Sequence, residues 1–558
     1  ADGRWDEDLL ANEIYNPLGQ TEIKNDYLVG SINVHGKATW TILEGLNLSA
    51  FGSYTTINME SKTYVPNNIR LGMGSNGSAD IRNTKRSDIM GNIQLSYTKD
   101  LGKHHIDALA LMEGQTYNTG YNRARSTGFE TNYFGYNNLQ AGSTLNWGDV
   151  QSNKSQYSLM SYMGRLNYMF NDRYIATVNV RTDGSSKLGA NHKWGWFPSA
   201  SVAWIISNES WLKSNPNVNN LKLRAGYGVT GNQDAISAYN SLQLMNPSGT
   251  TIYNGSQVTT FAITSNANPD LQWETKKTFD VGIDGQFFGG RLNVTLDYYM
   301  STTSKMLYNY TVPVPPFTYG TLLANIGEMT NNGFEFAIGG DIIKTKDFSF
   351  TANLNAAFQK NKLSKLSGTY KGQELSTAPH IEISGVYDTS GLSSGRGTTY
   401  LIEGEPVGTF FVPKFSHFDE TGNYVLEDLN GDGKIDTETE GGDRYIAGQA
   451  IPKVTGALNL GFKYKNWDLT AQFNGAFGHM IYNGTNETYS NMEMTHCYNV
   501  LASAPTAGKG NGIYGIIKEV QDAALIIEIA KEVCIKVDKG SVYVSADDAQ
   551  QSPKEEKK

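Results

Sequence analysis

The residues with the most definite chemistry form a short loop of alternating oxygen-bearing groups. We assign its ligand atoms to Asp428, Asn430, Asp432, Lys434 (through the backbone carbonyl) and Asp436. These residues stand at alternate positions of the loop, and Gly433 lies where a sharp turn is needed to aim the oxygens at one point. The spacing is typical of an EF-hand-type calcium loop, so Ca²⁺ is the one cofactor that we predict.

The residue that should close this loop is not defined by the pattern. Thr439 stands where a bidentate acid is expected, and Glu440 or Asp443 would have to replace it. The alternative interpretation is an Asp- and Gly-rich turn in an exposed loop that binds no metal. Both interpretations stay open at this point.

Three further patterns carry less chemistry. Residues 72–77 match G-x-G-x-x-G and residues 391–395 match G-x-S-x-G, but both lie in polar segments rich in Gly and Ser. Neither has the strand–turn–helix context that a dinucleotide site or a nucleophile elbow requires. His104 and His105 are interpreted as a surface pair at the start of a strand. We therefore predict that the protein is not an enzyme.

Composition excludes several classes of protein. The chain has 558 residues, a net charge of −9, 59 glycines and 32 tyrosines, and only 39% of its residues are hydrophobic. The negative charge argues against a nucleic-acid partner. The two cysteines, Cys497 and Cys534, form neither a disulfide framework nor a zinc motif. The sequence contains no run of about 18 apolar residues, so it predicts no membrane-spanning helix. A β-barrel needs no such helix, because its strands of about 10 residues, in which apolar and polar side chains alternate, cross the membrane.

A period of two is the strongest signal along the chain. Between Val454 and Tyr464, and again between Trp467 and Phe477, apolar side chains alternate with small or polar ones. Aromatic residues flank the turn between these segments on the apolar side, as in the interface girdle of a membrane barrel. Residues 46–54, 221–229, 292–298 and 348–356 repeat the alternation. Each segment predicts a strand with one apolar face.

Short turns alternate with long polar segments. The predicted turns lie near residues 43–45, 100–103, 171–173, 288–291, 345–347 and 465–466, with a longer one at 207–220. The long segments cover residues 55–87, 115–155, 231–272 and 361–449. This rhythm predicts an all-β protein: an antiparallel transmembrane β-barrel wall of about 14 strands, with long extracellular loops. A soluble all-β fold with one buried face is the alternative.

Several segments resemble SusC/RagA-type TonB-dependent outer-membrane receptors in residue pattern and in order. They are SYMGRLNY at 161–168, RTDGSS at 181–186, WFPS at 196–199, LKLRAGYG at 221–228, TGNQ at 230–233, NPDLQWE at 268–274, NIGEM at 325–329 and DLNGDGKID at 428–436. The resemblance runs from about residue 20 to about residue 490.

The resemblance implies a bacterial outer-membrane receptor surrounded by lipid. Members of that family import oligosaccharides or peptides with a SusD-type lipoprotein and the TonB complex, through a 22-stranded barrel around an N-terminal plug. Residues 1–490 are accordingly interpreted as a partial barrel, with about 14 of 22 strands and no plug. An incomplete barrel leaves strand edges exposed to lipid, so we expect it not to transport alone.

The end of the chain resembles a different protein. GIYGIIKEV at 512–520, LIIEIA at 525–530 and CIKVDKGSVY at 534–543 are similar to the small β domain of YajC, a Sec translocase accessory subunit. The resemblance assigns residues 509–546 to that domain and implies Sec translocase partners at the inner membrane. Residues 491–508 are interpreted as the junction of two unrelated parts, and residues 547–558 as a charged disordered tail.

The leading functional prediction is therefore TonB-dependent nutrient uptake. A Sec accessory function of the tail and a secreted β-rich adhesin are the alternatives. The sequence assigns no substrate-binding residue, although aromatic residues expected in long loops are candidates for stacking on sugar rings: Tyr117, Tyr121, Tyr133, Phe134 and Tyr136.

Overall fold

The computed structural model describes residue 5 and residues 15–375, 380–383, 397–418, 424–436 and 442–483, together with strand residues 518–519, 525–528, 533–538 and 541–546. Antiparallel strands make up most of these residues, so the prediction of an all-β protein is confirmed. Within the same ranges, no helix has the length and apolar character needed to cross a membrane.

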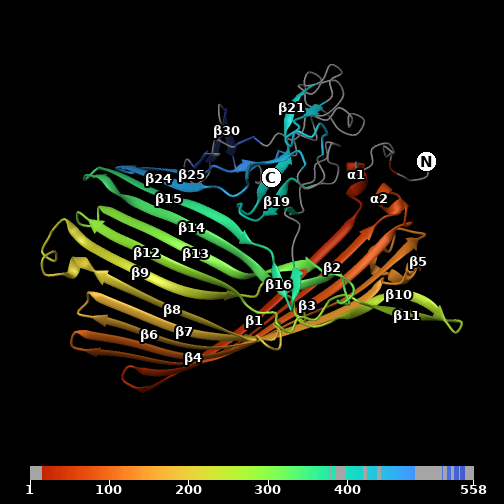
Figure 1. Ribbon diagram of the computed structural model, residues 1–558, viewed down its shortest axis with the longest axis horizontal. Helices are drawn as coiled ribbons and strands as arrows, with labels where there is room; N and C mark the ends of the chain where they lie inside the picture. Colours follow the sequence, from red (N-terminus) through yellow and green to blue (C-terminus); the bar gives the residue numbers. More distant parts are fainter. Residues whose placement is uncertain are drawn as a thin grey trace, which may run out of the picture.

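One large antiparallel sheet follows the order of the chain and curls into a trough (Figure 1). Its path of 14 strands confirms the predicted number. Within the described residues, the first and last of these strands each pair with a single neighbour in the sheet, which leaves the trough open. The strands are β1 (Lys24–Leu43), β2 (Leu46–Val65), β3 (Ser78–Leu101), β4 (His104–Phe129), β6 (Val150–Phe170), β7 (Tyr174–Ser185), β8 (Trp194–Ile205), β9 (Val218–Asn232), β12 (Glu274–Phe287), β13 (Leu292–Thr311), β14 (Thr321–Lys344), β15 (Phe348–Lys365), β24 (Val454–Tyr464) and β25 (Trp467–Phe477).

The short connections gather at one end of the sheet, which we call the turn end; the opposite end is the loop end (Figure 1). All seven predicted hairpins are present. Gly45 joins β1 to β2 at φ +84°, and a β-carbon there would lie 2.2 Å from the carbonyl oxygen of Thr98. Only glycine meets both conditions, because it tolerates a positive φ and has no side chain to collide.

Strand length is where the sequence-based prediction was wrong. The strands β3 and β4 contain 24 and 26 residues, and they continue through parts of 55–87 and 115–155 that we expected to be loops. At about 3.3 Å per residue, a strand of this length spans about 80 Å, whereas the apolar band of an outer-membrane barrel is about 25 Å tall. Much of each long strand therefore extends beyond the band, where polar residues outnumber apolar ones on both faces.

Small elements fill the loop end between the long strands. The helix α1 (Pro17–Gln20) precedes β1. The segments predicted as loops contain α2 (Arg70–Met73), η1 (Gly135–Asn137), η2 (Leu139–Ala141), β5 (Gly142–Thr144), β10 (Met245–Tyr253), β11 (Ser256–Ile263), β16 (Gly368–Tyr370), β17 (Gln373–Leu375), β18 (His380–Glu382), β19 (Thr399–Ile402), β20 (Thr409–Pro413), β21 (Phe415–Phe418), β22 (Tyr424–Leu426) and β23 (Arg444–Gln449). At the turn end, η3 (Ile206–Asn208) leads from β8 towards β9.

The tail also contains antiparallel strands. Strand β26 (Met480–Ile481) pairs with β27 (Lys518–Glu519), and a separate sheet joins β28 (Leu525–Glu528), β29 (Val533–Asp538) and β30 (Ser541–Ala546). The predicted junction at 491–508 and charged tail at 547–558 lie outside the described residues. The YajC-like domain and its boundaries remain predictions.

Buried apolar side chains collect at the loop end. Three clusters surround Trp273, Tyr310 and Phe129, which belong to extensions of the sheet or to the loops beside it. Near the turn end, by contrast, large apolar side chains such as Ile93 remain 55% exposed on the sheet surface. The sheet therefore has a water-excluding core only where its loops cover it.

Candidate functional site on the inner face of the sheet

Strand alternation gives the sheet two chemically different faces. On β3, Ile93 and Leu95 lie on one face, and Asn92 and Gln94 lie on the other. Register carries this division across the sheet, because Leu95 stands opposite Leu48 of β2. On the polar face, residues of the non-adjacent strands β4, β7 and β9 line one common hollow, which a sheet can form only on its concave side. The polar face is thus the inside of the trough, and the apolar face is the outside.

An acidic cluster occupies the inner face towards the turn end. The guanidinium of Arg224 on β9 lies 3.1 Å from Asp284 and 3.2 Å from Asp280, both on β12. Its third partner is Asp297 on β13. Lys222 stands opposite Asp284 and Glu335 stands opposite Asp297 on the same face. Two cations among four carboxylates leave a net negative patch, which can attract a cationic group or donors from sugars and peptides.

Aromatic side chains mark the inner face nearer the loop end. Tyr117 of β4 stacks on Tyr157 of β6, with ring centroids 4.6 Å apart. The ammonium of Lys187 lies 4.2 Å from the centre of the Tyr157 ring. Lys187 is only 8% exposed, and this burial lowers the pKa of its ammonium. The tyrosines thus have a cation as a neighbour, in an arrangement that a cation–π interaction stabilises.

Arginines extend this part of the inner face further along β3 and β4. The guanidinium of Arg82 lies 4.1 Å from the centre of the Tyr121 ring. Arg123 holds the carboxylate of Asp80 through hydrogen bonds of 3.1 and 2.8 Å from its Nε. Arg86 lies on the same face and is exposed. The loop-end part of the inner face is therefore cationic and aromatic, unlike the acidic cluster.

A hollow of about 350 Å³ opens on the inner face beside these tyrosines. Arg181 on its wall donates from Nε to both carboxylate oxygens of Asp183, at 2.8 and 2.9 Å. It also donates to Ser161 Oγ at 3.0 Å, and Glu113 lies 3.9 Å away. Fixed donors and acceptors beside an aromatic wall can position a polar ligand such as a sugar or a peptide.

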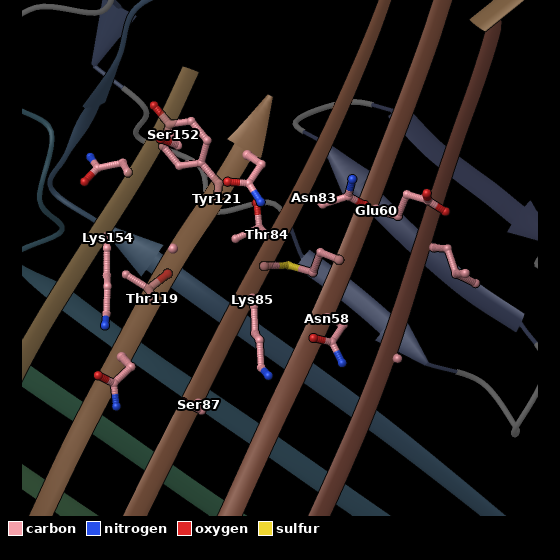
Figure 2. A pocket seen from close by; sticks show the side chains of 17 residues that line it. Asn58, Glu60, Asn83, Thr84, Lys85, Ser87, Thr119, Tyr121, Ser152 and Lys154 are labelled. Atoms are coloured by element: carbon pink, nitrogen blue, oxygen red, sulfur yellow. The ribbon is translucent and has the colours of Figure 1, made fainter. Parts of the chain in front are cut away.

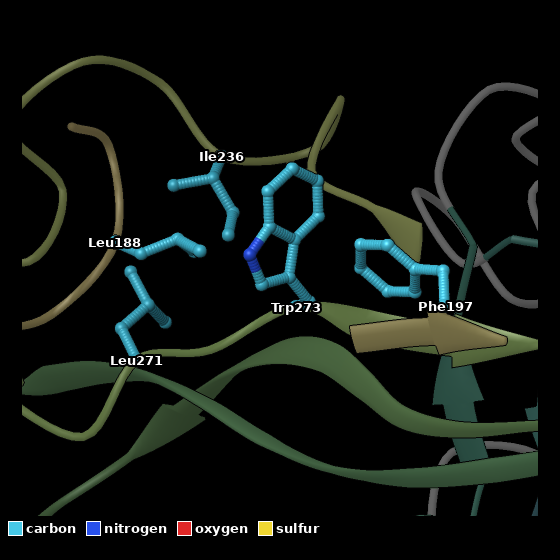
Figure 3. Close-up of a cluster of buried hydrophobic side chains, with 5 residues drawn as sticks. All are labelled: Leu188, Phe197, Ile236, Leu271 and Trp273. Atoms are coloured by element: carbon cyan, nitrogen blue, oxygen red, sulfur yellow. The ribbon is translucent and has the colours of Figure 1, made fainter. Parts of the chain in front are cut away.

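A hydrophobic cluster attaches the β9–β12 loop to the rim of this hollow (Figure 3). Trp273 meets Phe197 of β8 edge to face, with ring centroids 5.4 Å apart. Ile236 and Leu271 of this same loop, together with Leu188 of the β7–β8 connection, surround the indole. The indole N–H also donates to the Lys193 carbonyl at 3.3 Å. This packing holds the loop in place next to the inner face.

The predicted calcium residues form one compact turn. The carboxylate of Asp428 accepts bonds from the backbone N–H of Gly431 at 2.6 Å and of Gly433 at 2.8 Å. Asp432 likewise accepts from the backbone N–H of Lys434 at 2.8 Å. Across the described ranges, no three His, Cys, Asp or Glu side chains converge as metal ligands would. Calcium binding by residues 428–436 remains a prediction.

Asp443 lies beyond residues 428–436 in the chain but accepts hydrogen bonds from the backbone of their turn. Its carboxylate is fully buried and accepts from the backbone N–H of Leu429 at 2.7 Å and of Asp436 at 2.8 Å. The bond from Asp436, followed by those from Leu429 and Asn430, lowers the pKa of this carboxyl. Thr439 and Glu440, the other candidates for closing the loop, lie outside the described residues.

The remaining sequence candidates have structural roles or lie outside the described residues. Gly72 packs against the backbone of Pro66, and the segment that begins there leads directly into strand β3. His104 starts β4, as predicted, and its ring lies 2.7 Å from the hydroxyl of Tyr168. Residues 391–395 lie outside the described residues.

The aromatic candidates divide into two groups. Tyr117 and Tyr121 were predicted in a loop but lie on the inner face of β4, because that strand is longer than expected. Tyr133, Phe134 and Tyr136 lie in the segment between β4 and β5, as predicted. Sequence reasoning missed the acidic cluster, although Asp280 and Asp284 share the phase of the polar face and could have been found from it.

Comparison with known proteins gives a consistent match. The family described as "TonB dependent receptor-like, beta-barrel" matches residues 2–495. TonB-dependent receptor P3 of Formosa agariphila is 30% identical over 508 residues, which cover 87% of this chain and 48% of that receptor. TonB-dependent receptor SusC of Bacteroides thetaiotaomicron is 29% identical over 540 residues, which cover 91% of this chain and 50% of SusC. The chain spans about half the length of the curated relatives it matches.

Solved structures give the same result for the fold. The structure of the RagAB peptide transporter aligns with a TM-score of 0.73 at 22% identity, covering 93% of this chain and 56% of that one. The RagAB peptide importer in its open-open state aligns with a TM-score of 0.75 at 21% identity, over 96% of this chain and 57% of that one. At these identities the likeness establishes the architecture alone.

Proposed function

Because the chain belongs to the TonB-dependent receptor-like β-barrel family, we propose that it forms part of the wall of an outer-membrane receptor that takes up nutrients. The observation that carries the proposal is the division of the 14-stranded sheet into an apolar outer face and a polar inner face. Lipid solvates the first face, and the second lines the path of a polar substrate.

The substrate class that we propose is an oligosaccharide or a peptide. SusC and the RagAB peptide transporter are among the similar proteins, and the second is named for peptides. The inner face offers tyrosine rings, guanidinium donors and carboxylate acceptors, which suit both classes. We further propose a SusD-type lipoprotein partner and energy from the TonB complex, because the resemblance to SusC-type receptors implies both.

Uptake by living cells tests this proposal. A strain with the full-length gene and one with the gene deleted would be supplied with labelled oligosaccharides and with labelled peptides. We expect the deletion to abolish uptake of one class, and depletion of TonB to have the same effect. Equal uptake of every substrate by both strains, or uptake that persists without TonB, would contradict the proposal.

We also propose that residues 428–436 bind Ca²⁺. The support is the spacing of oxygen groups around Gly433, together with the buried Asp443 carboxylate that organises the backbone of the turn. Calorimetry on the full-length receptor should detect binding at millimolar calcium, and Asp428→Asn should abolish it. If the parent receptor and Asp428→Asn gave indistinguishable calcium titrations, residues 428–436 would be an ordinary Asp- and Gly-rich turn that binds no calcium.

A further inference from the structure

The outer face has a hollow of its own, separate from the inner surface. It measures about 870 Å³ and crosses strands β1, β2, β3, β4 and β6 (Figure 2). The side chains that line it are mainly amides, hydroxyls and two lysines, Lys85 and Lys154. A polar hollow on the lipid-facing side of a barrel has no role in moving a substrate through the lumen.

The hollow begins directly beyond the apolar belt. From the turn end towards the loop end, the outer face of β3 changes from Leu95, Ile93 and Ile89 to Ser87 and Lys85. In the same direction, the outer face of β6 changes from Tyr162 and Met160 to Ser158 and Lys154. This level corresponds to the boundary between acyl chains and head groups in a surrounding lipid leaflet.

One cross-strand row forms the floor of the hollow. Register aligns in one row Gly30, Asn58, Lys85, Gly120 and Lys154. Gly120 lies between the two lysines, which are about 10 Å apart at the usual strand spacing. The row therefore places one lysine on each side of Gly120, which has no side chain.

Neither lysine has an acidic partner in the described part of the chain. The nearest acid in the lining, Glu60, lies 2.9 Å from the ammonium of Lys62. Figure 2 shows the side chains of Lys85 and Lys154 running in the same direction, towards the end of the hollow where Ser87 lies. Both ammonium groups thus point towards the apolar belt.

We propose that this hollow binds the phosphorylated head group of an outer-leaflet lipid. The phosphate lies over Gly120 between Lys85 and Lys154, amide and hydroxyl groups on the walls hydrogen-bond the rest of the head group, and the acyl chains lie along the belt below. Charge complementarity and continuity with the belt favour a lipid over a second copy of this chain, whose matching surface would bring lysine against lysine.

The proposal depends on the outer-membrane location but not on the imported substrate. A binding assay tests it with the full-length receptor in lipid nanodiscs and diphosphorylated lipid A as the probe. The double variant Lys85→Gln/Lys154→Gln should bind this lipid roughly thirtyfold more weakly. The matched control is Lys277→Gln, since Lys277 is exposed on the outer face of β12 opposite Val229 and Thr302. It should change affinity less than twofold.

Two further measurements exclude a folding defect and a free-phosphate site. The charge-preserving variant Lys85→Arg/Lys154→Arg should restore binding, and sodium phosphate at ten times the lipid concentration should not displace the lipid. Unchanged affinity in the double Gln variant, or displacement by sodium phosphate, would overturn the proposal. Substrate uptake by the double Gln variant should equal that of the parent, which separates failure here from failure of the uptake function.

Discussion

The turn end and the loop end of the sheet are parts of the same strands, but they place apolar side chains in opposite environments. On β3, Leu95 near the turn end is 40% exposed, whereas Ala79 near the loop end is fully buried beside Tyr64 and Phe129. The first arrangement would be unfavourable in water and is favourable in lipid. The second forms a conventional water-excluding core.

This difference shows that strands with the same alternation of apolar and polar residues are stable both in lipid, at the turn end, and in water, at the loop end. Near the turn end, strand pairing satisfies the backbone and lipid solvates the apolar face. Near the loop end, strands extend into water, and loops must cover whatever apolar surface remains. The two ends should therefore respond differently to substitutions of the same kind.

The largest effect is expected where the β9–β12 loop is fixed to the sheet. Trp273→Ala removes the centre of the cluster in Figure 3 and should destabilise the closed loop by about 3–5 kcal/mol. Limited proteolysis of the full-length receptor should then cut within residues 233–272 much faster. Trp467→Ala is the control, since Trp467 is 80% exposed at the turn end. Equal protease sensitivity of the two variants would contradict the difference between the ends.

The next effect compares neighbouring residues on opposite faces near the turn end. Leu95→Arg places a charge on the lipid face and should cost about 2–4 kcal/mol if the site is near the bilayer midplane. Gln94→Arg places the same charge on the inner face and should cost far less. Urea titration of receptor folded into lipid vesicles measures both. If Gln94→Arg is the more damaging change, the assignment of the faces is wrong.

The sequence was sufficient for the faces and the turns. The alternation in 454–464 and 467–477 predicted β24 and β25 together with their connecting turn, because a period of two determines which side chains share a face. The aromatic residues Tyr464 and Trp467 also stand opposite each other at that turn, as expected for a girdle.

The sequence was not sufficient for the ends of the strands. In 115–129, apolar and polar residues no longer alternate, since both faces of β4 meet water or loops there. Tyr117 and Tyr121 were therefore assigned to a loop. Residues 428–436, which we predicted to bind calcium, form one turn, but the action of Asp443 depends on a contact across 14 residues of chain that no local spacing specifies.

Low pH should destabilise the turn end by protonating Glu209, with a smaller effect than the substitutions above. Its carboxylate accepts from Tyr174 Oη at 2.7 Å and Trp204 Nε1 at 3.0 Å, and it pairs with Arg173 at 2.8 Å. The bond from Tyr174, followed by the one from Trp204, lowers the pKa of Glu209. The carboxylate therefore stabilises the fold fully above its unfolded pKa of about 4.3, and this contribution is lost as the pH falls through the lower folded value.

Hydrogen exchange in residues 206–217, measured from pH 5 down to pH 2.5, tests this prediction. Exchange relative to an unstructured peptide should increase at the acid end in the parent receptor. Glu209→Gln should already exchange faster at pH 5 and should show no further acid-dependent increase. A pH dependence that survives the substitution would assign the effect to another group.

The smallest effect should come from the polar turn at the loop end, which backbone hydrogen bonds to Asp428 and Asp443 hold together. Asp443→Asn keeps the size of the side chain but removes the charge that the backbone N–H groups of Leu429 and Asp436 stabilise. We expect faster hydrogen exchange across 429–436 at neutral pH, whether or not calcium is present. Asp432→Asn should instead leave exchange nearly unchanged without calcium and should weaken calcium binding, because the hydrogen bonds of Asp432 in the described part of the chain lie within the turn. If Asp443→Asn alters exchange only when calcium is added, then Asp443 acts as a ligand rather than as a support of the backbone, and the loop end closes here around a metal.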